Sequence, residues 1–418
     1  MSIDFIYAVM QEFALVYPLF MSYLWMVGGI TYFFHWEDRG RRKIDDPDIP
    51  FVAPGISVIV PAHNEERTLK ETIESLRALN YANYEILVVN DGSTDGTAAL
   101  IDDYAAQGHI RAFHLASNQG KAAALRVGAL AARNEILVCI DGDAILDANA
   151  LLWIVPHFND PRVGAVTGNP RVRTRSTLLG KIQVGEFSSI VGLIKRSQRI
   201  YGRVFTVSGV VAAFRRSALH AVGYWDTSKL TDDIDISWRL QMDHWAIRFE
   251  SHALCWILMP ETLKGLWRQR LRWAMGGVEV AIDHFAGLLR WRRRHMWPVL
   301  IEFLLSVLWS YTMLILGLSL FISQVMDIPA MPDLTRWLPS WGGALIGLSC
   351  LLQFALSVVV DGQYERRFQR HYYWIIWYPV AYWLLAVFTT IVALPRVLFR
   401  RRRKAVWKSP DRGEQFSD

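Results

Sequence analysis

Long runs without charge lie toward both ends of this chain, and a mixed globular pattern fills the middle. Residues 13–34 contain no charged side chain, and a membrane-spanning helix needs about 20 apolar residues. Three more apolar runs follow the globular part, at about 297–325, 341–360 and 374–395. The pattern therefore predicts a membrane protein with one globular domain between α-helical transmembrane segments.

The charges beside the first run predict its orientation. Acidic residues but no Lys or Arg precede it, and basic residues follow it from 39 to 43. The positive-inside rule then places the N-terminus outside and residue 35 onward in the cytoplasm. A cleaved signal peptide is the alternative, but the run lacks a basic segment before it and a small-residue cleavage site.

The last apolar run leaves the topology open. The segment at 361–373 is basic and is therefore expected in the cytoplasm. If the run at 374–395 spans the membrane, the basic tail lies on the opposite side, against the same rule. Pro379 interrupts this run, so a re-entrant or interfacial element is the alternative.

The expected organisation has five parts. They are an N-terminal transmembrane helix at 1–35, a cytoplasmic linker at 36–50, a cytoplasmic catalytic domain at 51–280, a C-terminal transmembrane region of about three apolar segments at 281–396, and a basic tail at 397–418.

Strands alternate with helices in the globular part. β-rich runs lie at 56–62, 84–91, 111–116 and 135–140, and helical patterns lie at 68–79, from about 95, and at 119–132. This alternation predicts an α/β fold with a mostly parallel sheet and helices on both faces.

Polar motifs follow three of these strands, and ligands of parallel sheets bind beyond the carboxyl ends of the strands. PAHNEE holds Asn64 and Glu65, NDGSTD holds Asp91, and DGDA holds Asp141 and Asp143. We therefore expect these side chains to converge on one crevice. A dinucleotide-binding domain is the rival, but the turn after the first strand lacks G-x-G-x-x-G.

Asp141 and Asp143 form a D-x-D pair at the end of an apolar strand. Two carboxylates on one turn can hold a divalent metal that bridges a diphosphate, and Mg²⁺ suits such a site, with Mn²⁺ as the alternative. Asp91 could bond a base edge, such as the N3–H of uracil, or close a βα loop. Lys121 could meet the base or a phosphate, or could extend over the surface.

Asp232 and Asp233 stand at the head of a helical pattern, after Thr231. They could favour the helix N-terminus through its dipole. Alternatively, one of them is a general base that takes the proton from an acceptor hydroxyl. Two neighbouring carboxylates raise one pKa, which suits a base.

The motif QRLRW lies in a helical stretch before the C-terminal apolar runs. Arg270 or Arg272 could stabilise a departing diphosphate, and Trp273 could stack on a sugar ring. A basic and aromatic interfacial helix is the alternative reading of the same residues.

Charge and cysteine content exclude some classes of function. The formal net charge is +6, but the basic residues cluster beside apolar runs, so they indicate topology rather than nucleic-acid binding. Cys139, Cys255 and Cys350 have no short spacing, so they predict neither a zinc site nor a disulfide framework.

The order NDGSTD, DGD, TDD, QRLRW, with membrane flanks, resembles the processive family 2 glycosyltransferases, which include cellulose, chitin and hyaluronan synthases. Longer stretches are similar to one branch, the bacterial poly-beta-1,6-N-acetyl-D-glucosamine synthases. They are VGAVTGNPRVRTRSTLLGKIQVGEFSSI, RIYGRVFTVSGVVAAFRRSAL, ALCWILMPETLKGLWRQRLRWAMGG and WKSPDRG.

The resemblance implies a GT-A fold and an inverting transfer from UDP-N-acetylglucosamine to a growing polysaccharide. It implies Asp233 as the base, in a motif that reads TDD where the family has T-E-D. It implies that Asp91 contacts the uridine and that Asp141 and Asp143 hold the diphosphate and its metal. The implied donor side comprises Asn64, Glu65, Asp91, Lys121, Asp141 and Asp143. The implied acceptor and diphosphate side comprises Ser208, Gly209, Asp232, Gln269, Arg270, Arg272 and Trp273.

The resemblance also implies a bacterial inner-membrane location, a role in biofilm matrix, and a small transmembrane partner subunit with cyclic di-GMP at the shared interface. The rivals are another beta-linked polysaccharide synthase, a polyprenyl-phosphate sugar transferase, and a non-enzymatic channel or export subunit. QRLRW argues against the sugar transferase, and the intact acids at 91, 141, 143 and 233 argue against the non-enzymatic subunit.

Overall fold

The structure is a computed structural model that describes residues 3–37, 46–47, 53–326, 341–364 and 378–399. Most of the expected linker, most of the basic segment before the last apolar run, and all but the start of the basic tail lie outside the described residues.

A mixed sheet organises the globular domain, in the order β3-β2-β1-β4-β7-β6-β8-β5. Its strands are β1 (Ile56–Ala62), β2 (Tyr84–Asp91), β3 (Arg111–Leu115), β4 (Ile136–Ile140), β5 (Ile145–Leu146), β6 (Val163–Val172), β7 (Val211–Arg215) and β8 (Ala246–Ile257). The half formed by β3, β2, β1 and β4 is parallel, as the sequence predicts. In the other half, β7 is antiparallel to β4 and β6, while β6 and β8 are parallel.

Helices cover both faces of this sheet, which confirms the predicted α/β architecture. Alternate residues of a strand point to opposite faces. Val58 and Val60 pack in the core beneath α2 (Leu69–Arg77), α3 (Thr97–Ala106) and α5 (Ala150–Ile154). Ile59 packs in the core on the other face, beneath the helices α4 (Lys121–Ala131), α8 (Arg216–Ala221) and α9 (Asp232–Met242).

The remaining helices lie away from the parallel half of the sheet. They are α1 (Ile3–Tyr32), continued by the π-helical turn Phe33–Glu37, then α6 (Leu178–Glu186), α7 (Leu193–Ile200), α10 (Leu263–Leu288), α11 (Trp297–Met326), α12 (Trp341–Asp361) and α14 (Tyr378–Leu398). α10, which carries QRLRW, continues past the expected domain boundary at 280.

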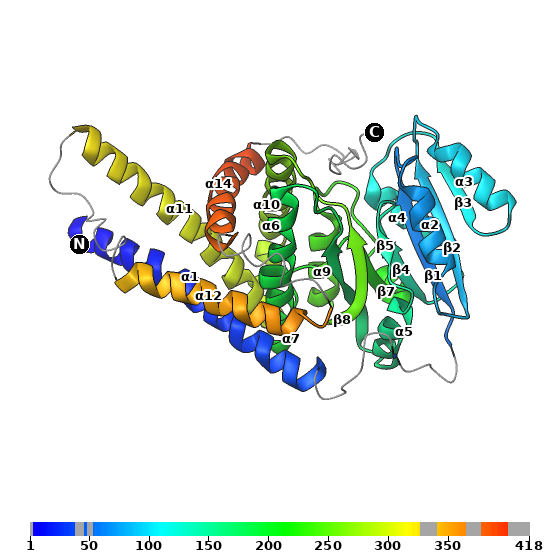
Figure 1. Cartoon of the computed structure of the whole chain (residues 1–418), viewed down its shortest axis with the longest axis horizontal. Helices are drawn as coiled ribbons and strands as arrows, with labels where there is room; N and C mark the ends of the chain where they lie inside the picture. Colours follow the sequence, from blue (N-terminus) through cyan, green and yellow to red (C-terminus); the bar gives the residue numbers. More distant parts are fainter. Residues whose placement is uncertain (1–2, 38–45, 48–52, 327–340, 365–377, 400–418) are drawn as a thin grey trace.

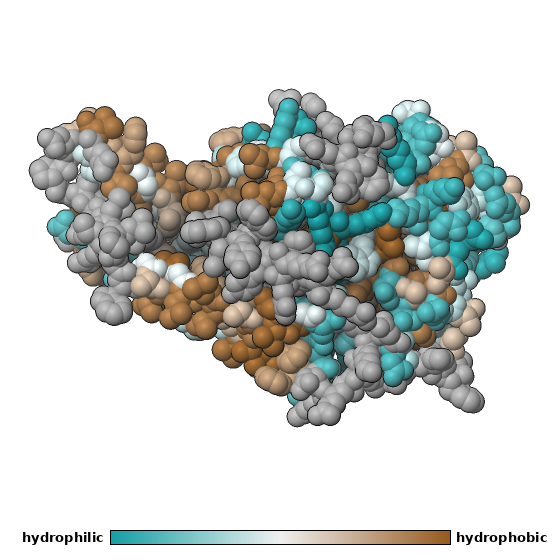
Figure 2. All heavy atoms as spheres, viewed as in Figure 1, coloured by the Kyte–Doolittle hydropathy of each residue, from teal (hydrophilic) through white to brown (hydrophobic). Residues whose placement is uncertain are grey.

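Figure 1 shows α1, α11, α12 and α14 gathered at one end of the molecule, with the parallel strands at the other. Hydrophobic residues cover much of the visible surface of α1 and α12 (Figure 2). Within the described residues, three helical stretches are long and apolar enough to cross a membrane, Ile3–Glu37, Trp291–Ser323 and Gly342–Asp361, and Tyr382–Leu398 forms a shorter apolar helix.

Residues 365–377, just before Tyr378 and Pro379, lie outside the described part of the chain, so the interruption expected at Pro379 stays a prediction. α14 runs from Tyr378 to Leu398 without a break at this proline, which stands in the first described turn.

Candidate active site

Three polar turns meet at the carboxyl ends of parallel strands. β1 lies between β2 and β4 in the same direction, so the segments after Ala62, Asn90 and Ile140 leave the sheet at one edge. These are the segments that contain PAHNEE, NDGSTD and DGDA. The structure therefore brings the three sequence motifs to one side of the sheet, as predicted.

Lys121 joins two sides of the site. It is the first residue of α4, and its ammonium forms an ion pair with the carboxylate of Asp141. The same Nζ donates a hydrogen bond to the main-chain oxygen of Gly209 at 2.9 Å. Burial disfavours the charged ammonium, but the carboxylates of Asp141 and Asp232 outweigh burial and raise the pKa of Lys121.

Asp233 lies on the other side of Gly209. A β-carbon built on Gly209 would lie 3.3 Å from Asp233 Oδ2, so only a glycine leaves the present space beside the carboxylate. Asp233 Oδ1 accepts a hydrogen bond from the Ile234 N–H at 2.9 Å, in the first turn of α9. Its carboxylate therefore faces both a helix N-terminus and the turn that precedes β7.

The pKa of Asp233 suits a proton acceptor. Burial raises it to about 6, and the adjacent carboxylate of Asp232 acts in the same direction, while Lys121 and Arg272 oppose the shift. The pair of acids was expected to raise one pKa, and the direction agrees, although burial is the larger cause. A carboxyl group that titrates near neutral pH can both accept and release a proton.

The arginines of QRLRW have different surroundings. Arg270 is buried, donates to Glu186 Oε2 on α6 at 2.5 Å, and lies with its guanidinium carbon 4.2 Å from the ring centroid of Trp273. The Arg270–Glu186 contact joins α10 to α6, and the Arg270–Trp273 contact lies within α10. Arg272 is exposed, and its charge is close enough to lower the pKa of Asp233. Gln269 Nε2 lies 4.0 Å from Met259 Sδ.

α10 also contacts the two residues that precede Asp232. A β-carbon at Gly276 would lie 2.7 Å from Thr231 Cβ, so α10 approaches the residue before Asp232 as closely as a glycine allows. One turn further on, Glu279 Oε2 accepts a hydrogen bond from the Leu230 N–H at 3.0 Å. The helix that carries QRLRW therefore fixes the start of α9, where Asp233 stands.

Asp91 holds a loop in this structure. Its side chain is fully buried, and its two carboxylate oxygens accept the N–H groups of Gln119 and Gly120 at 2.7 and 2.8 Å. Both oxygens are therefore used to place Lys121, the next residue. The contact of Asp91 with uridine stays a prediction.

Asn64 and Glu65 also hold turns together. Asn64, at φ 55°, accepts the Thr94 N–H on Oδ1 at 2.9 Å. Glu65 is buried and accepts the Thr68 hydroxyl at 2.8 Å. The Asn64 contact fixes the turn after β1 against the NDGSTD turn, and the Glu65 contact holds the segment just before α2. A donor contact by either residue stays a prediction.

Sequence reasoning missed two residues beside the site. The Ser208 N–H donates to Thr167 Oγ1 at 2.8 Å, and Lys195 Nζ donates to the same oxygen at 3.2 Å. Thr167 lies in β6 and Lys195 in α7, and both are buried. The sequence around Lys195 reads as an ordinary basic helix, so no local signal distinguishes it from a solvated lysine.

Comparisons with known proteins identify the family. The family model described as "Glycosyltransferase like family 2" matches residues 54–276. The chain belongs to the family 2 glycosyltransferases. This glycosyltransferase is 37% identical over 405 residues to the poly-beta-1,6-N-acetyl-D-glucosamine synthase of Staphylococcus epidermidis. The match covers 96% of this chain and 98% of that protein. It is 39% identical over 406 residues to the synthase of the same name from Staphylococcus aureus, with the same two coverages.

A solved structure supports the glycosyltransferase fold. The mannosyltransferase of Pyrobaculum calidifontis, in complex with GDP-Man and Mn²⁺, matches with a TM-score of 0.60 and 20% identity, over 91% of this chain and 99% of that one. The GT-A fold expected from the sequence is thereby confirmed.

Asp141 and Asp143 fit a metal that substrate phosphates help to hold. Burial raises the pKa of Asp141, and the carboxylates of Asp143 and Asp232 add to the rise while Lys121 opposes it. The carboxylates of Asp141, Asp143 and Asp232 therefore act on one another beside the single ammonium of Lys121, and a bound cation would reduce their repulsion. In the part of the chain that the structure describes, no three His, Cys, Asp or Glu side chains are grouped to hold a metal by themselves. A site of two carboxylates completed by phosphates suits Mg²⁺.

Proposed function

We propose that this glycosyltransferase polymerises N-acetylglucosamine from UDP-N-acetylglucosamine into a β-1,6-linked chain. The observation that carries the proposal is the similarity to the staphylococcal synthases, which covers 96% of this chain and therefore includes its apolar helices. Similarity restricted to residues 54–276 would support a glycosyltransferase and no more.

The proposed reaction is a single displacement with inversion. The acceptor hydroxyl gives its proton to the Asp233 carboxylate as its oxygen forms a bond to the anomeric carbon of the donor. The bond from that carbon to the diphosphate oxygen breaks, and UDP leaves with the electron pair. The raised pKa of Asp233, about 6, supports its role as the acceptor of this proton.

The donor side is proposed to lie at Asp141, Asp143 and Lys121. A divalent metal held by the two carboxylates supplies positive charge to the diphosphate when it is bound. The Lys121 ammonium, held between Asp141 and the oxygen of Gly209, keeps a further positive charge beside the same position. Arg272 adds positive charge from α10, on the side of Asp233.

Membrane insertion and export complete the proposal. The N-terminus lies outside and the catalytic domain in the cytoplasm of a bacterial inner membrane, on the charge asymmetry around residues 13–34. The apolar helices lie together at one end of the molecule (Figure 1), where a product could leave. A small transmembrane partner, cyclic di-GMP and a role in biofilm matrix rest on the family resemblance alone.

The donor and the linkage are tested together. Membranes that contain the full chain receive labelled UDP-N-acetylglucosamine or labelled UDP-glucose, with membranes carrying the Asp233→Asn variant as the control. We expect a polymer from the first donor only, with 1,6 linkages by linkage analysis and sensitivity to a hydrolase specific for poly-β-1,6-N-acetylglucosamine. Equal incorporation of glucose, or a polymer with another linkage, would overturn the assignment.

A further inference from the structure

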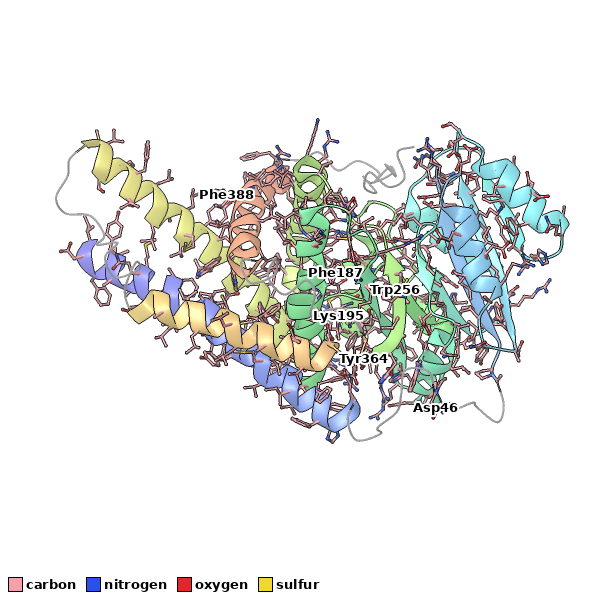
Figure 3. All side chains as sticks on the ribbon, viewed as in Figure 1. Asp46, Phe187, Lys195, Trp256, Tyr364 and Phe388 are labelled. Carbon is pink, nitrogen blue, oxygen red and sulfur yellow. The ribbon has the colours of Figure 1, made fainter. Side chains whose placement is uncertain are left out.

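A buried lysine lies between the membrane-side helices and the catalytic sheet. Lys195, on α7, is 6% exposed. Its ammonium donates to Thr167 Oγ1 on β6 at 3.2 Å and lies 5.9 Å from the centroid of the Phe249 ring on β8. Figure 3 shows it where the helical end of the molecule meets the sheet. A lysine is rarely buried this fully unless it is paired with another group.

Thr167 connects this ammonium to the base. The Thr167 hydroxyl oxygen accepts both the Lys195 ammonium and the main-chain N–H of Ser208, at 3.2 and 2.8 Å. Ser208 is followed by Gly209, against which the Asp233 carboxylate packs. A continuous series of contacts therefore runs from α7, through β6 and the turn before β7, to the first turn of α9.

The charges of Lys195 and Asp233 also act on each other. Burial lowers the pKa of Lys195 to about 7, and the Asp233 carboxylate opposes that shift. The other charged groups around Asp233 approach from α9, α4 and α10, and they are Asp232, Lys121 and Arg272. Lys195 adds a positive charge from α7. At a pH below about 7 it is mainly protonated, so it favours the ionised form of the base.

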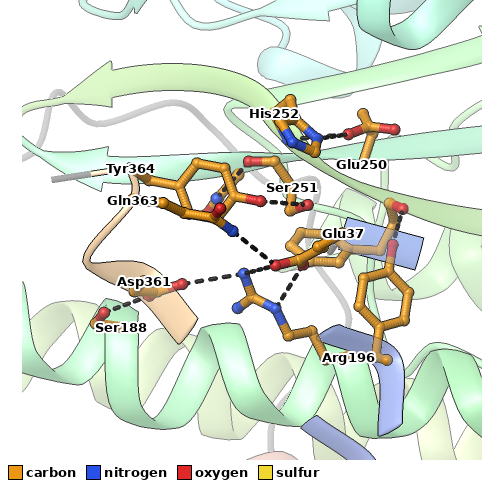
Figure 4. A network of polar contacts seen from close by, with 12 residues as sticks. Glu37, Ser188, Arg196, Glu250, Ser251, His252, Asp361, Gln363 and Tyr364 are labelled. Carbon is orange, nitrogen blue, oxygen red and sulfur yellow. Dashed lines mark hydrogen bonds and ion pairs between the residues drawn. The ribbon is translucent and has the colours of Figure 1, made fainter. Parts of the chain in front are cut away.

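The membrane-side helices fix the position of this lysine. α7 packs against α1, where a side chain at Gly28 would collide with Ser197. The next residue, Arg196, is fully buried and lies 2.8 Å from Glu37, in the π-helical turn after α1, and 3.0 Å from Asp361, the last residue of α12 (Figure 4). Lys195 is therefore held by the part of the molecule that contains the apolar helices.

We propose that Lys195 is a positioning residue of the transferase site, which fixes the Thr167–Ser208 contact beside the base and supplies a buried positive charge that keeps Asp233 ionised. The inference rests on the proposed function, because it takes Asp233 to be the general base.

The pH dependence of polymer synthesis tests this role. The full chain in membranes is compared with Lys195→Met, with Lys195→Arg, and with Lys70→Met, which makes the same change on the exposed face of α2. In K195M the ionised base loses a favourable charge, so we expect the acid limb of the kcat profile to move to higher pH by roughly half a unit or more. K195R should restore most of the shift, and K70M should match the wild type.

The controls separate this inference from the proposed function. If Asp233→Asn still forms polymer at the wild-type rate, the proposed function fails. If D233N is inactive and K195M lowers the rate with no shift of the acid limb, only the role of Lys195 fails. UDP binding and thermal unfolding in detergent show whether each variant is folded.

If K195M does not fold, a second variant tests the role of Lys195. Thr167→Val keeps the volume of the side chain and removes the oxygen that accepts both Ser208 and Lys195. We expect T167V to bind UDP normally and to lose at least severalfold in kcat. A wild-type kcat and an unchanged pH profile in T167V would overturn the proposal.

Discussion

Lys121 donates a hydrogen bond to the main-chain oxygen of Gly209 at 2.9 Å while its ammonium also pairs with Asp141. One side chain thereby ties the D-x-D turn after β4 to the turn that packs against Asp233. The metal position and the base are consequently parts of one connected site, and a change on either side is expected to affect transfer.

Removal of a D-x-D carboxylate should abolish transfer. Asp143→Ala takes away one of the two proposed oxygen ligands, so we expect polymer synthesis to be lost with expression and thermal unfolding unchanged. Chelation of divalent cations should have the same effect on the wild type, and added Mg²⁺ or Mn²⁺ should restore it. Full activity of D143A, or of the wild type in chelator, would remove this pair from the mechanism.

Asp232 should shift the acid limb of the pH profile. The Asp233 pKa is raised to about 6 by burial and by Asp232, so activity should fall as the pH drops below 6 and the base becomes protonated. Asp232→Asn removes the second cause, and the limb should then move to lower pH by roughly half a unit to one unit. This shift is opposite in sign to that expected for K195M. If the acid limb of Asp232→Asn stays at the wild-type pH or moves to higher pH, Asp232 does not raise the pKa of Asp233.

Gly276 should be sensitive to the smallest substitution. In Gly276→Ala the new methyl group would lie 2.7 Å from Thr231 Cβ, so α10 or the TDD turn must shift. Overpacking of this kind costs about 1–3 kcal/mol, and we expect lower thermal stability and at least a tenfold loss of polymer synthesis. The matched control is Gly317→Ala in α11, where nothing lies within 4 Å of the new carbon. Equal behaviour of the two variants would contradict the close approach.

Arg196 should contribute strongly to the stability of the fold. Arg196→Met leaves the carboxylates of Glu37 and Asp361 buried without the guanidinium between them. Breaking a buried ion pair costs about 3–5 kcal/mol, so the variant should unfold at a much lower temperature in detergent. Arg77→Met breaks an exposed pair with Glu74 and should change stability by less than about 1 kcal/mol. Similar unfolding temperatures for both would refute a structural role of the buried network.

Local patterns in the sequence predict the parallel half of the sheet and its helices. β1, β2 and β4 are short apolar runs that end in polar turns, and this pattern depends on neighbours in the chain. Helices also separate β6, β7 and β8, yet β7 runs antiparallel to both of its neighbours, β4 and β6. An alternation of strands and helices predicts parallel neighbours, so it does not indicate an antiparallel pair such as the one that contains Ala165↔Phe214.

The same distinction applies to the site. Asp141, Lys121, Gly209 and Asp233 were expected from motifs, and the structure brings them together. Arg270 belongs to the same motif as Arg272, yet it pairs with Glu186, 84 positions away. Lys195 was missed for the same reason, because its burial depends on packing that its neighbours in the chain do not reveal.

The most direct measurement compares catalysis with binding in Asp233→Asn. The substitution keeps nearly the same volume but cannot accept the acceptor proton, and a positioned base contributes about a hundredfold to ten-thousandfold in rate. Donor binding should survive, since the diphosphate is assigned to Asp141, Asp143 and Lys121. We predict UDP affinity near that of the wild type by calorimetry, with polymer formation lost. Two results would contradict Asp233 as the general base. One is polymer formation at the wild-type rate, and the other is a loss of UDP binding together with the loss of activity.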